Sequence, residues 1–431
     1  MTDPMNIGLL GYGIVGTSVA RILSEHADEL ARRAGVPIQV AHIAVRDATK
    51  LRGFEPPGAR FTTVPREVVT DPSVDVVVEV MGGTEPARAL ILEAIANKKH
   101  IVTANKELLS TSGREVMSAA ETAGVDLLFE ASVGGGIPII RPLRESLAGD
   151  RIRRVMGIVN GTTNFILTRM SEMGEDFSTA LVEATRLGYA EADPSADVDG
   201  HDAAAKIAIL ASLAFDARVV ASDVPREGIT GITRADMAAA HQLGYEVKLL
   251  AIAEMDAGEI SARVGPAMVP RTHPLASVRD VFNAVFVEAD QVGELMFLGR
   301  GAGGSPTASA VVGDIVEVAR NASEGARTPT YVGFHADARL RSEDRAMMRY
   351  YVVLSVDDQP GVLAEVAGTF ARHDVSIASV RQEGSGDEAT LMLITHTASR
   401  GSHRATFTDL AGLDVVKSVD ATIPVVGTAE G

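Results

Sequence analysis

The 431-residue sequence contains no cysteine, which excludes disulfides, thiolate zinc sites and cysteine nucleophiles. It also contains no tryptophan, and aromatic residues make up only 4% of the chain, so its cores must consist mainly of Val, Ile, Leu and Ala. No apolar run approaches the roughly 20 residues that a membrane-spanning helix needs. Residues 1–10 lack the basic and apolar regions of a signal peptide. These absences predict a soluble, cytoplasmic protein.

Positive charge is also scarce, since 40 Lys and Arg stand against 57 Asp and Glu and the formal net charge is −17. A general nucleic-acid binder needs clustered Lys and Arg, so this balance argues against that class. It does not exclude an anionic cofactor, because a helix N-terminus or a local arginine can hold one. The length predicts about three domains.

The first part of the chain alternates short apolar runs with helical segments. Strands are predicted over 6–10, 39–45, 74–80, 100–103 and 125–130, and helices over 17–30, 85–97 and 112–123. This alternation is typical of βαβ units in a parallel sheet. We therefore expect a dinucleotide-binding domain over 1–130, completed by a helix within about 303–325.

The sequence pattern changes after residue 130, because residues 134–138 contain three glycines and a proline, which interrupt helices and strands. We predict an α+β domain over 131–302, with a strand-like segment at 152–159, helices over 165–173, 177–187 and 201–214, and an antiparallel sheet from 248–253, 261–269, 284–287 and 293–298. A linker is expected over 326–349. Residues 350–426 show the βαββαβ order of a ferredoxin-like domain, with strands at 350–356, 377–382, 389–395 and 414–416.

A glycine loop follows the first predicted strand and opens the first predicted helix. It contains Gly11, Gly13 and Gly16, with Ile14 and Val15 inside the motif. The first glycine permits a tight turn, the second lets the backbone approach a pyrophosphate, and the third lets helix and strand pack closely. We expect these residues to bind a dinucleotide.

The end of the second predicted strand bears on the choice of cofactor. An acidic residue there would favour NAD, whereas this strand ends in Arg46, followed by Asp47. Because an arginine can pair with a 2′-phosphate, NADP is favoured over NAD. The alternative is that Arg46 and Asp47 form a solvated surface pair.

Six segments resemble, in the same order, the hallmark segments of homoserine dehydrogenases. They are Thr103–Lys106, Glu130–Pro138, Asn160–Asn164, Leu187–Pro194, Asp199–Lys206 and Gly301–Thr307. The resemblance implies a reversible, NAD(P)H-dependent reduction of aspartate 4-semialdehyde to homoserine, in the synthesis of threonine, methionine and isoleucine.

The resemblance also implies roles for individual residues. Lys206 matches the acid/base lysine, Lys106 a second lysine that contacts substrate and cofactor, and Glu191 and Asp202 the residues that hold the substrate amino group. The positions that match the cofactor's surroundings are Thr103, Lys106, Gly188 and Gly303. Those that match a monovalent-cation site, usually for sodium, are Glu130, Val133, Gly135 and Ile137.

The chemistry needs such groups independently of the family. Negative charge grows on an aldehyde oxygen as hydride arrives, and a positioned ammonium can stabilise it and donate a proton. Burial or a second cation can lower a lysine pKa toward the working pH. Asp202 and Lys206 share one helix face at i, i+4 spacing, although an ordinary surface ion pair has the same pattern. Lys106 could instead be a helix-start lysine after a capping segment.

The acidic segment 189–200 is predicted to be a loop, and its other acids and the adjoining His201 have simpler interpretations. His201 is expected to be structural or solvated, and Asp193, Asp197 and Asp199 to cap the loop, because the spacing lacks the rest of an EF-hand. For the Glu130 segment, converging carbonyls would suit a hard cation. A glycine-rich hinge between domains is the alternative there.

Residues 357–363 and 375–377 resemble an ACT domain, a regulatory module of amino-acid pathway enzymes. The resemblance implies feedback control, with threonine as the expected effector and a homo-oligomer, either dimer or tetramer. The alternative is a dimerisation domain without a ligand. Two rival functions are a phosphoglycerate dehydrogenase-like enzyme, which would place its glycine loop in mid-chain, and a nucleotide and amino-acid sensor without catalysis.

Overall fold

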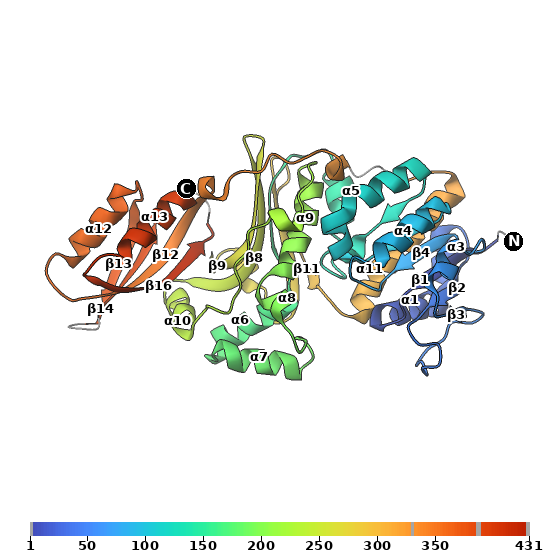
Figure 1. The fold of residues 1–431 in the computed structure, drawn as a ribbon, viewed down its shortest axis with the longest axis horizontal. Helices are drawn as coiled ribbons and strands as arrows, with labels where there is room; N and C mark the ends of the chain where they lie inside the picture. The colour runs from blue at the N-terminus through green and yellow to red at the C-terminus, as the bar shows by residue number, and fades with distance from the viewer. Residues whose placement is uncertain (1–2, 329–331, 385–388, 428–431) are drawn as a thin grey trace.

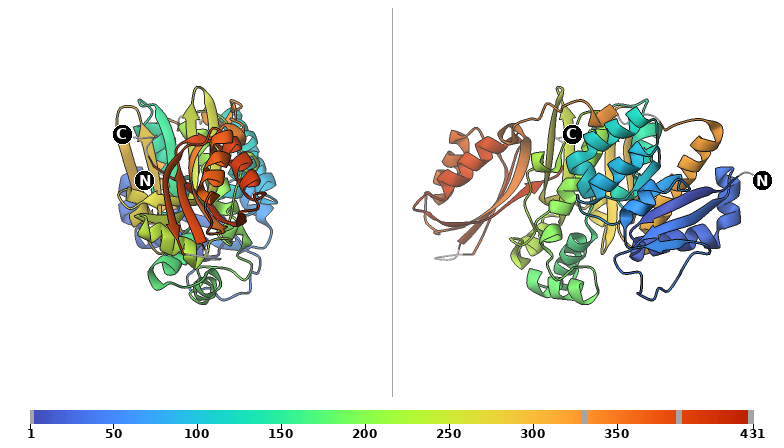
Figure 2. Two further views of the ribbon diagram at one scale, coloured as in Figure 1. Left: turned by 90° about the vertical axis from the view of Figure 1, so that its left-hand side faces the viewer. Right: turned by 45° about the vertical axis from the view of Figure 1, so that its right-hand side comes forward.

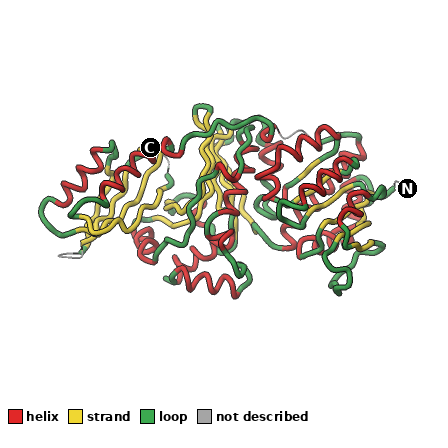
Figure 3. Tube along the Cα trace, in the orientation of Figure 1, coloured by secondary structure: helices red, strands yellow, loops and turns green. Residues whose placement is uncertain are grey.

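The structure is a computed structural model that describes residues 3–328, 332–384 and 389–427. Figure 1 shows an elongated molecule with a sheet-and-helix unit at its N-terminal end and a second one at its C-terminal end. Figure 3 shows that strands also fill the middle of the molecule, between these two units. The predicted α/β fold with a nucleotide-binding part, a substrate part and a ferredoxin-like part is confirmed. No helix in the described ranges combines the length and apolar content needed to cross a membrane.

The N-terminal sheet has six parallel strands in the order β3-β2-β1-β4-β5-β6. Its strands are β1 (Met5–Leu10), β2 (Ile38–Ala44), β3 (Arg60–Thr62), β4 (Val76–Glu79), β5 (His100–Thr103) and β6 (Leu127–Leu128). The order reverses between β1 and β4, and in doubly wound sheets the dinucleotide crosses at that point. Fully buried side chains such as Ile7 and Val77 form the core, because helices cover both faces.

Six helices surround this sheet: α1 (Ile14–Glu25), α2 (Ala27–Ala34), α3 (Pro65–Thr70), α4 (Ala87–Ala96), α5 (Lys106–Ala123) and α11 (Gly304–Glu324). The single helix predicted over 17–30 is wrong, since the chain leaves helical geometry at His26. The predicted start of α5 at Ser112 is also wrong. Asn105 caps the helix by accepting the N–H of Leu108, so α5 begins at Lys106 and only kinks at Ser112. The short β3 and α3 were not predicted.

The second sheet has ten strands and contains all four predicted antiparallel segments. Its order is β11-β10-β7-β8-β9-β16-β12-β14-β13, with β15 paired to β12. The first five strands are β7 (Ile152–Ile158), β8 (Tyr245–Asp256), β9 (Glu259–Pro270), β10 (Phe282–Ala289) and β11 (Gly293–Arg300). β8 and β9 form a long hairpin, because Ala257 and Gly258 both adopt the left-handed conformation that a tight turn requires.

Helices and short turns follow or cover these strands. They are α6 (Gly161–Met173), α7 (Phe177–Arg186), α8 (Ser195–Val198), α9 (His201–Ala214), α10 (Arg234–Gln242), the 3-10 turns Glu130–Ser132, Ala221–Asp223 and Pro274–Ser277, and a π turn at Pro142–Ser146. α9, which matches its predicted range, packs on β7, β8 and β9. α8 lies in a segment that was predicted as a loop, and α10 was not predicted.

The C-terminal part contains β12 (Met347–Val356), α12 (Val362–Arg372), β13 (Ile377–Glu383), β14 (Ala389–Thr395), β15 (Ala398–Ser399), α13 (Arg400–Leu410) and β16 (Val416–Val425). Figures 1 and 2 show both helices on one side of the strands. The predicted βαββαβ order is confirmed. The predicted last strand, 414–416, is wrong because the polar residues of β16, such as Lys417 and Asp420, hide a strand that runs to Val425.

The ten-stranded sheet consists of a central half, which ends in β9, and a C-terminal half, which begins with β16. Val425 of β16 pairs in parallel with Met268 of β9, and the N–H of Val426 donates to the Met268 carbonyl at 2.9 Å. The C-terminal part therefore extends the central sheet, which the sequence did not predict.

The segment predicted as a linker, 326–349, contacts both α5 of the nucleotide-binding part and β9 of the central sheet. It contains short turns at Val332–Phe334 and Glu343–Arg345. Phe334 is buried, and its ring occupies the space where a Cβ on Gly113 of α5 would lie. Leu340 forms a bridge with Ile260 of β9. These contacts hold the connection between the first sheet and the C-terminal part in place.

Candidate active site

The glycine loop has the close approaches that its sequence predicts. Gly11 has φ of +102°, and a Cβ there would lie 3.0 Å from the Val80 carbonyl oxygen. A Cβ on Gly16 would lie 2.3 Å from the Gly11 oxygen, so this position permits only glycine. Gly13 faces open space, which leaves the loop accessible to a ligand. The loop therefore fits a dinucleotide pyrophosphate.

A second helix N-terminus lies beside this loop. Gly303 caps α11 with φ of +120°, and a Cβ on Gly304 would meet the Ile14 side chain at 2.6 Å. The first turns of α1 and α11 are thus neighbours, and both direct free N–H groups and positive dipole ends outward. Ile14 is 79% exposed at the start of α1. The predicted residues Gly13, Ile14 and Gly303 are brought together here.

Arg46 lies exposed after the end of β2. Asp47 accepts hydrogen bonds from the Thr49 N–H and hydroxyl, and these bonds lower the pKa of Asp47. Within the described residues Arg46 forms no ion pair with Asp47, so its guanidinium is available to a ligand.

The predicted lysines and carboxylate meet in one cluster. Lys206 Nζ lies 2.7 Å from Asp202 Oδ2, and Lys106 Nζ lies 3.2 Å from Asp202 Oδ1. Lys206 also donates to the Val159 carbonyl at 2.7 Å. Lys106 begins α5, at the C-terminal end of the parallel strands, whereas Asp202 and Lys206 belong to α9. The cluster therefore links α5, which flanks the first sheet, to α9, which packs on the second sheet.

The electrostatics of this cluster follow from its burial and pairing. Burial opposes ionisation of Asp202, but the ammonium groups of Lys206 and Lys106 outweigh it and lower the pKa of Asp202 to about 2. Burial likewise works against the charge on Lys106, but Asp202 outweighs it and raises the pKa of Lys106. The expectation that burial or a second cation lowers the lysine pKa is therefore wrong for Lys106, because an anion lies between the two cations.

Asn160 is an additional member that the sequence indicated only as part of a motif. Its side chain caps α6 by accepting the Thr163 N–H, and its amide donates to Asp202 at 2.9 Å and to Asp197 at 2.6 Å. A residue of one helix cap thus orients the carboxylate of another helix.

The acidic loop before α9 is exposed at Glu191. In the described parts of the chain the Glu191 carboxylate has no partner, and Gly188 turns the loop with φ of +77°. Asp193 accepts the Ser195 N–H, as expected of a capping acid, and His201 is exposed.

Thr103 is buried, and its hydroxyl points into the protein. It donates to Glu79 Oε2 at 2.7 Å, so only its backbone remains for a cofactor. Sequence reasoning missed Glu79, although an acidic residue that directly ends the apolar run Val76–Val78 was a usable signal.

The Glu130 segment is tightly organised. The Glu130 carboxylate accepts the N–H groups of Ile139, Ile140 and Arg141, at 2.6 to 2.9 Å. Sequence reasoning missed Asp314 of α11, which accepts the Glu130 N–H. Burial and the Glu130 charge raise the pKa of Asp314 well above its usual value. Among the described residues no backbone N–H is bonded to the carbonyls of Val133, Gly135 or Ile137.

The C-terminal part has a cavity of about 460 Å³ at the turn between β12 and α12. Asp357, Gln359, Gly361 and Gln382 are among its lining residues. Gly361 caps α12 with φ of +100°, and Asp357 is paired with Lys417 at 3.1 Å. The cavity offers a helix N-terminus and a carboxylate, the two groups that suit an amino acid.

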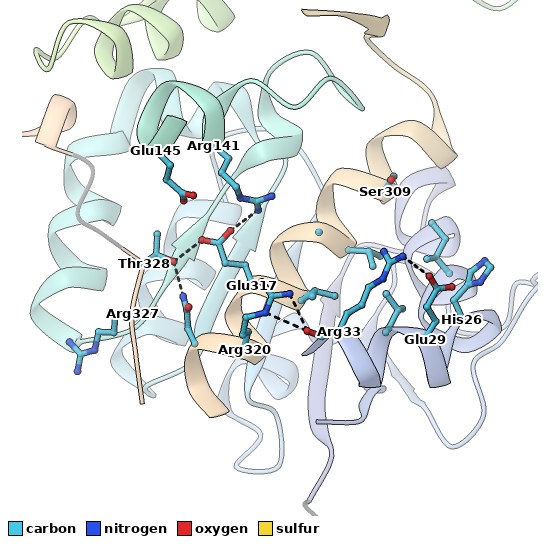
Figure 4. Close-up of a pocket in the computed structure, with 16 residues that line it drawn as sticks. His26, Glu29, Arg33, Arg141, Glu145, Ser309, Glu317, Arg320, Arg327 and Thr328 are labelled. Atoms are coloured by element: carbon cyan, nitrogen blue, oxygen red, sulfur yellow. Dashed lines mark hydrogen bonds and ion pairs between the residues drawn. The ribbon is translucent and has the colours of Figure 1, made fainter. Parts of the chain in front are cut away.

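A larger hollow of about 880 Å³ lies between α1, α2 and α11, and none of the predicted site residues lines it. Figure 4 shows that several of its polar groups bind one another. Glu317 contacts Arg141 and Thr328, and Arg320 donates to the Arg33 carbonyl.

A glycine loop at the switch point of a Rossmann sheet and two ammonium groups at the same sheet edge define a nicotinamide-dependent dehydrogenase. Two family models described as homoserine dehydrogenase match residues 138–316 and, for its NAD-binding domain, 11–130, and an ACT domain model matches 350–410.

Individual relatives agree. The chain is 51% identical to a homoserine dehydrogenase from Mycobacterium tuberculosis over 436 residues, which cover 99% of this chain and 98% of the relative. It is similar to the crystal structure of a Thiobacillus denitrificans homoserine dehydrogenase, with 41% identity, a TM-score of 0.93 and 98% coverage of each chain. A hyperthermophilic archaeal homoserine dehydrogenase solved with NADPH matches at 30% identity and a TM-score of 0.63, covering 76% of this chain and 100% of that one.

The chain belongs to the homoserine dehydrogenase family and carries an ACT domain. It is an NAD(P)-dependent oxidoreductase that interconverts aspartate 4-semialdehyde and homoserine.

Proposed function

We propose that the reaction takes place at the cluster of Lys206, Lys106 and Asp202. The observation that carries this proposal is that two lysines from different helices bind the two oxygens of one buried carboxylate. An ammonium has three N–H donors, and within the described part of the chain Lys206 uses two of them, on Asp202 and Val159. Its third donor is free for the aldehyde oxygen, to which Lys206 gives its proton.

The bound nicotinamide supplies the hydride, and the chain supplies charge and position. Among the described residues Lys106 has one carboxylate partner, so it retains donors for the substrate. It also lies at the carboxyl-terminal edge of the sheet, where a dinucleotide binds in this kind of fold. Among the described residues, Asp202 Oδ2 accepts hydrogen bonds from Asn160 and Lys206, and Oδ1 forms an ion pair with Lys106, which leaves a lone pair of Oδ1 for the substrate ammonium. Glu191 supplies a second carboxylate for that ammonium.

We assign the cofactor to Gly11, Gly13–Gly16, the Thr103 backbone, Lys106, Gly188 and Gly303. NADP is the proposed form, because Arg46 is exposed just after the end of β2, a position from which an arginine can pair with a 2′-phosphate. The NADPH complex of the archaeal relative supports this preference.

We also propose a monovalent cation, with sodium as the first candidate, at Glu130 and the carbonyls of Val133, Gly135 and Ile137. The donor set fits, because those carbonyls lack backbone donors in the described ranges and a carboxylate with three N–H partners retains one lone pair. A hinge role for the same glycines is compatible with this site.

Threonine is the proposed effector of the ACT cavity, and it would need to displace Lys417 to reach Asp357.

We propose a homo-oligomer as well. β11 is an edge strand with exposed Met296 and Leu298, and an apolar sheet edge of this kind is suited to pairing with a second copy. The proposed domain division is 1–130 with 303–325, 131–302, a connection over 326–349, and 350–426.

The activity is tested by initial rates with homoserine and either cofactor, followed by nicotinamide absorbance. Reduction of both cofactors with a higher kcat/KM for NADP is the expected result. A flat trace with both would leave the non-catalytic sensor as the better interpretation.

A further inference from the structure

Glu79 is a carboxylate that the proposed site does not use. It ends β4 and is 0% exposed. A buried carboxylate needs several donors to remain stable inside a protein. Glu79 Oε1 accepts the N–H groups of Met81 at 2.8 Å and Gly82 at 3.1 Å, and Oε2 accepts the Thr103 hydroxyl at 2.7 Å.

These hydrogen bonds form a closed ring between the turn after β4 and the turn after β5. The Thr103 oxygen accepts the Asn105 N–H at 3.1 Å, and the Asn105 amide donates back to the Gly83 carbonyl at 2.7 Å. Asn105 also caps α5, so the ring ends one residue before Lys106. The position of the lysine is thereby tied to the turn after the neighbouring strand.

The other side of the ring meets the glycine loop. Gly11 packs against Val80 so closely that a Cβ would lie 3.0 Å from the Val80 oxygen. β4 is also the first strand past the point where the sheet order reverses, and there the nicotinamide half of a dinucleotide lies. The ring therefore stands between the cofactor loop and the lysine.

We propose that Glu79 is a positioning residue for hydride transfer. It sets the distance between the Val80–Gly83 turn, which faces the nicotinamide half, and Lys106, which faces the substrate. Glu79 touches neither ligand, because its carboxylate is enclosed. The inference rests on the proposed roles of Lys106 and of the cofactor loop. Hydride transfer is sensitive to such positioning, since a displacement of about 1 Å can lower a rate on the order of 100-fold.

The test uses shape-conserving variants of the full chain. In Glu79→Gln the amide oxygen can still accept both backbone N–H groups, but the new NH₂ faces the Thr103 hydroxyl and opposes its donation. Thr103→Val removes the same bond from the other side. We expect either variant to lower kcat by about tenfold or more and to increase the deuterium isotope effect with 4-deuterated NADPH. Thr103→Ser, which keeps the hydroxyl, should recover most of the lost rate.

Asp126→Asn is the matched control. Asp126 is also a buried acid, directly before β6 at the opposite, amino-terminal end of the strands, and it accepts the Asn321 side-chain amide and the Thr328 N–H. It should lower Tm without changing kcat or the isotope effect. If Glu79→Gln and Thr103→Val behave like this control, the inference is overturned.

Should Glu79→Gln fail to fold, the comparison of Thr103→Val with Thr103→Ser tests the positioning role of Glu79.

The outcome for the proposed catalytic cluster is separate. Full turnover in Lys206→Met would overturn the proposed cluster, whatever the Glu79 variants do, and loss of turnover there with normal Glu79 variants would overturn only the positioning role.

Discussion

Lys106 Nζ lies 3.2 Å from Asp202 Oδ1, which links the first turn of α5 to the first turn of α9. The two helices belong to the nucleotide-binding and substrate parts of the chain. Their contact places the ends of two separately formed sheets around one anion. The proposed catalytic cluster is therefore complete only when the two parts are docked.

Replacing Lys206 tests its role as proton donor. We expect Lys206→Met to lower kcat by about 10²–10⁴-fold, because general acid catalysis is lost while the apolar stem is retained. The dissociation constant for NADPH, measured by fluorescence, should stay unchanged. Lys248→Met serves as the control, since Lys248 is a buried lysine outside the cluster.

Replacing Arg46 tests the cofactor preference. Arg46→Ala should raise the KM for NADP by about tenfold, because a charge-assisted contact with the 2′-phosphate is lost, and should leave the KM for NAD unchanged. Steady-state rates with each cofactor provide the measurement. The control is Arg66→Ala, an exposed arginine that is already paired with Glu93. Equal changes for both cofactors would contradict the assignment.

Lys248 should make stability depend on pH in the alkaline range. Burial lowers the pKa of Lys248 to about 8, whereas an unfolded lysine has a pKa of about 10.4. Between these values the unfolded chain binds more protons, so the free energy of unfolding rises with pH, by about 2–3 kcal/mol from this group. Urea unfolding from pH 7.5 to 10 should show the rise in the wild type. The rise should be smaller by that amount in Lys248→Met but not in the exposed Lys50→Met.

The ACT cavity should lose its effector when its carboxylate is neutralised. We expect Asp357→Asn to weaken threonine binding by about tenfold, because a charged contact to the ligand ammonium is removed. Calorimetry on the full chain measures this affinity. Asp420→Asn, which alters an acid of the same sheet outside the cavity, should bind threonine normally. Absence of threonine binding to the wild type would favour the dimerisation alternative.

The Glu130 site predicts a specific need for sodium. Turnover should rise with sodium concentration and then saturate, while tetramethylammonium makes up the rest of a constant ionic strength. Tetramethylammonium alone should not support this rise, because the larger cation cannot enter a carbonyl-lined site. Constant ionic strength removes general screening effects. Equal rates in both salts would remove the cation from the proposal.

Local pattern was sufficient for much of this molecule. The glycine spacing of Gly11, Gly13 and Gly16, the helix that carries Asp202 and Lys206, and the βαββαβ order of the C-terminal part each depend on residues close together in the chain. The errors also have local causes. Asn105 began α5 earlier than its periodicity indicated, and the polar residues of β16 concealed a long strand.

By itself, the sequence determined most of the helices and strands and which side chains can carry charge or protons, because these properties depend on neighbours a few residues away. Only the tertiary structure decided that Lys106 meets Asp202, that Asn160 and Glu79 orient the groups around them, and that Val425 joins the two halves of a sheet. Such contacts arise from how whole elements pack, and no short stretch of sequence contains that information.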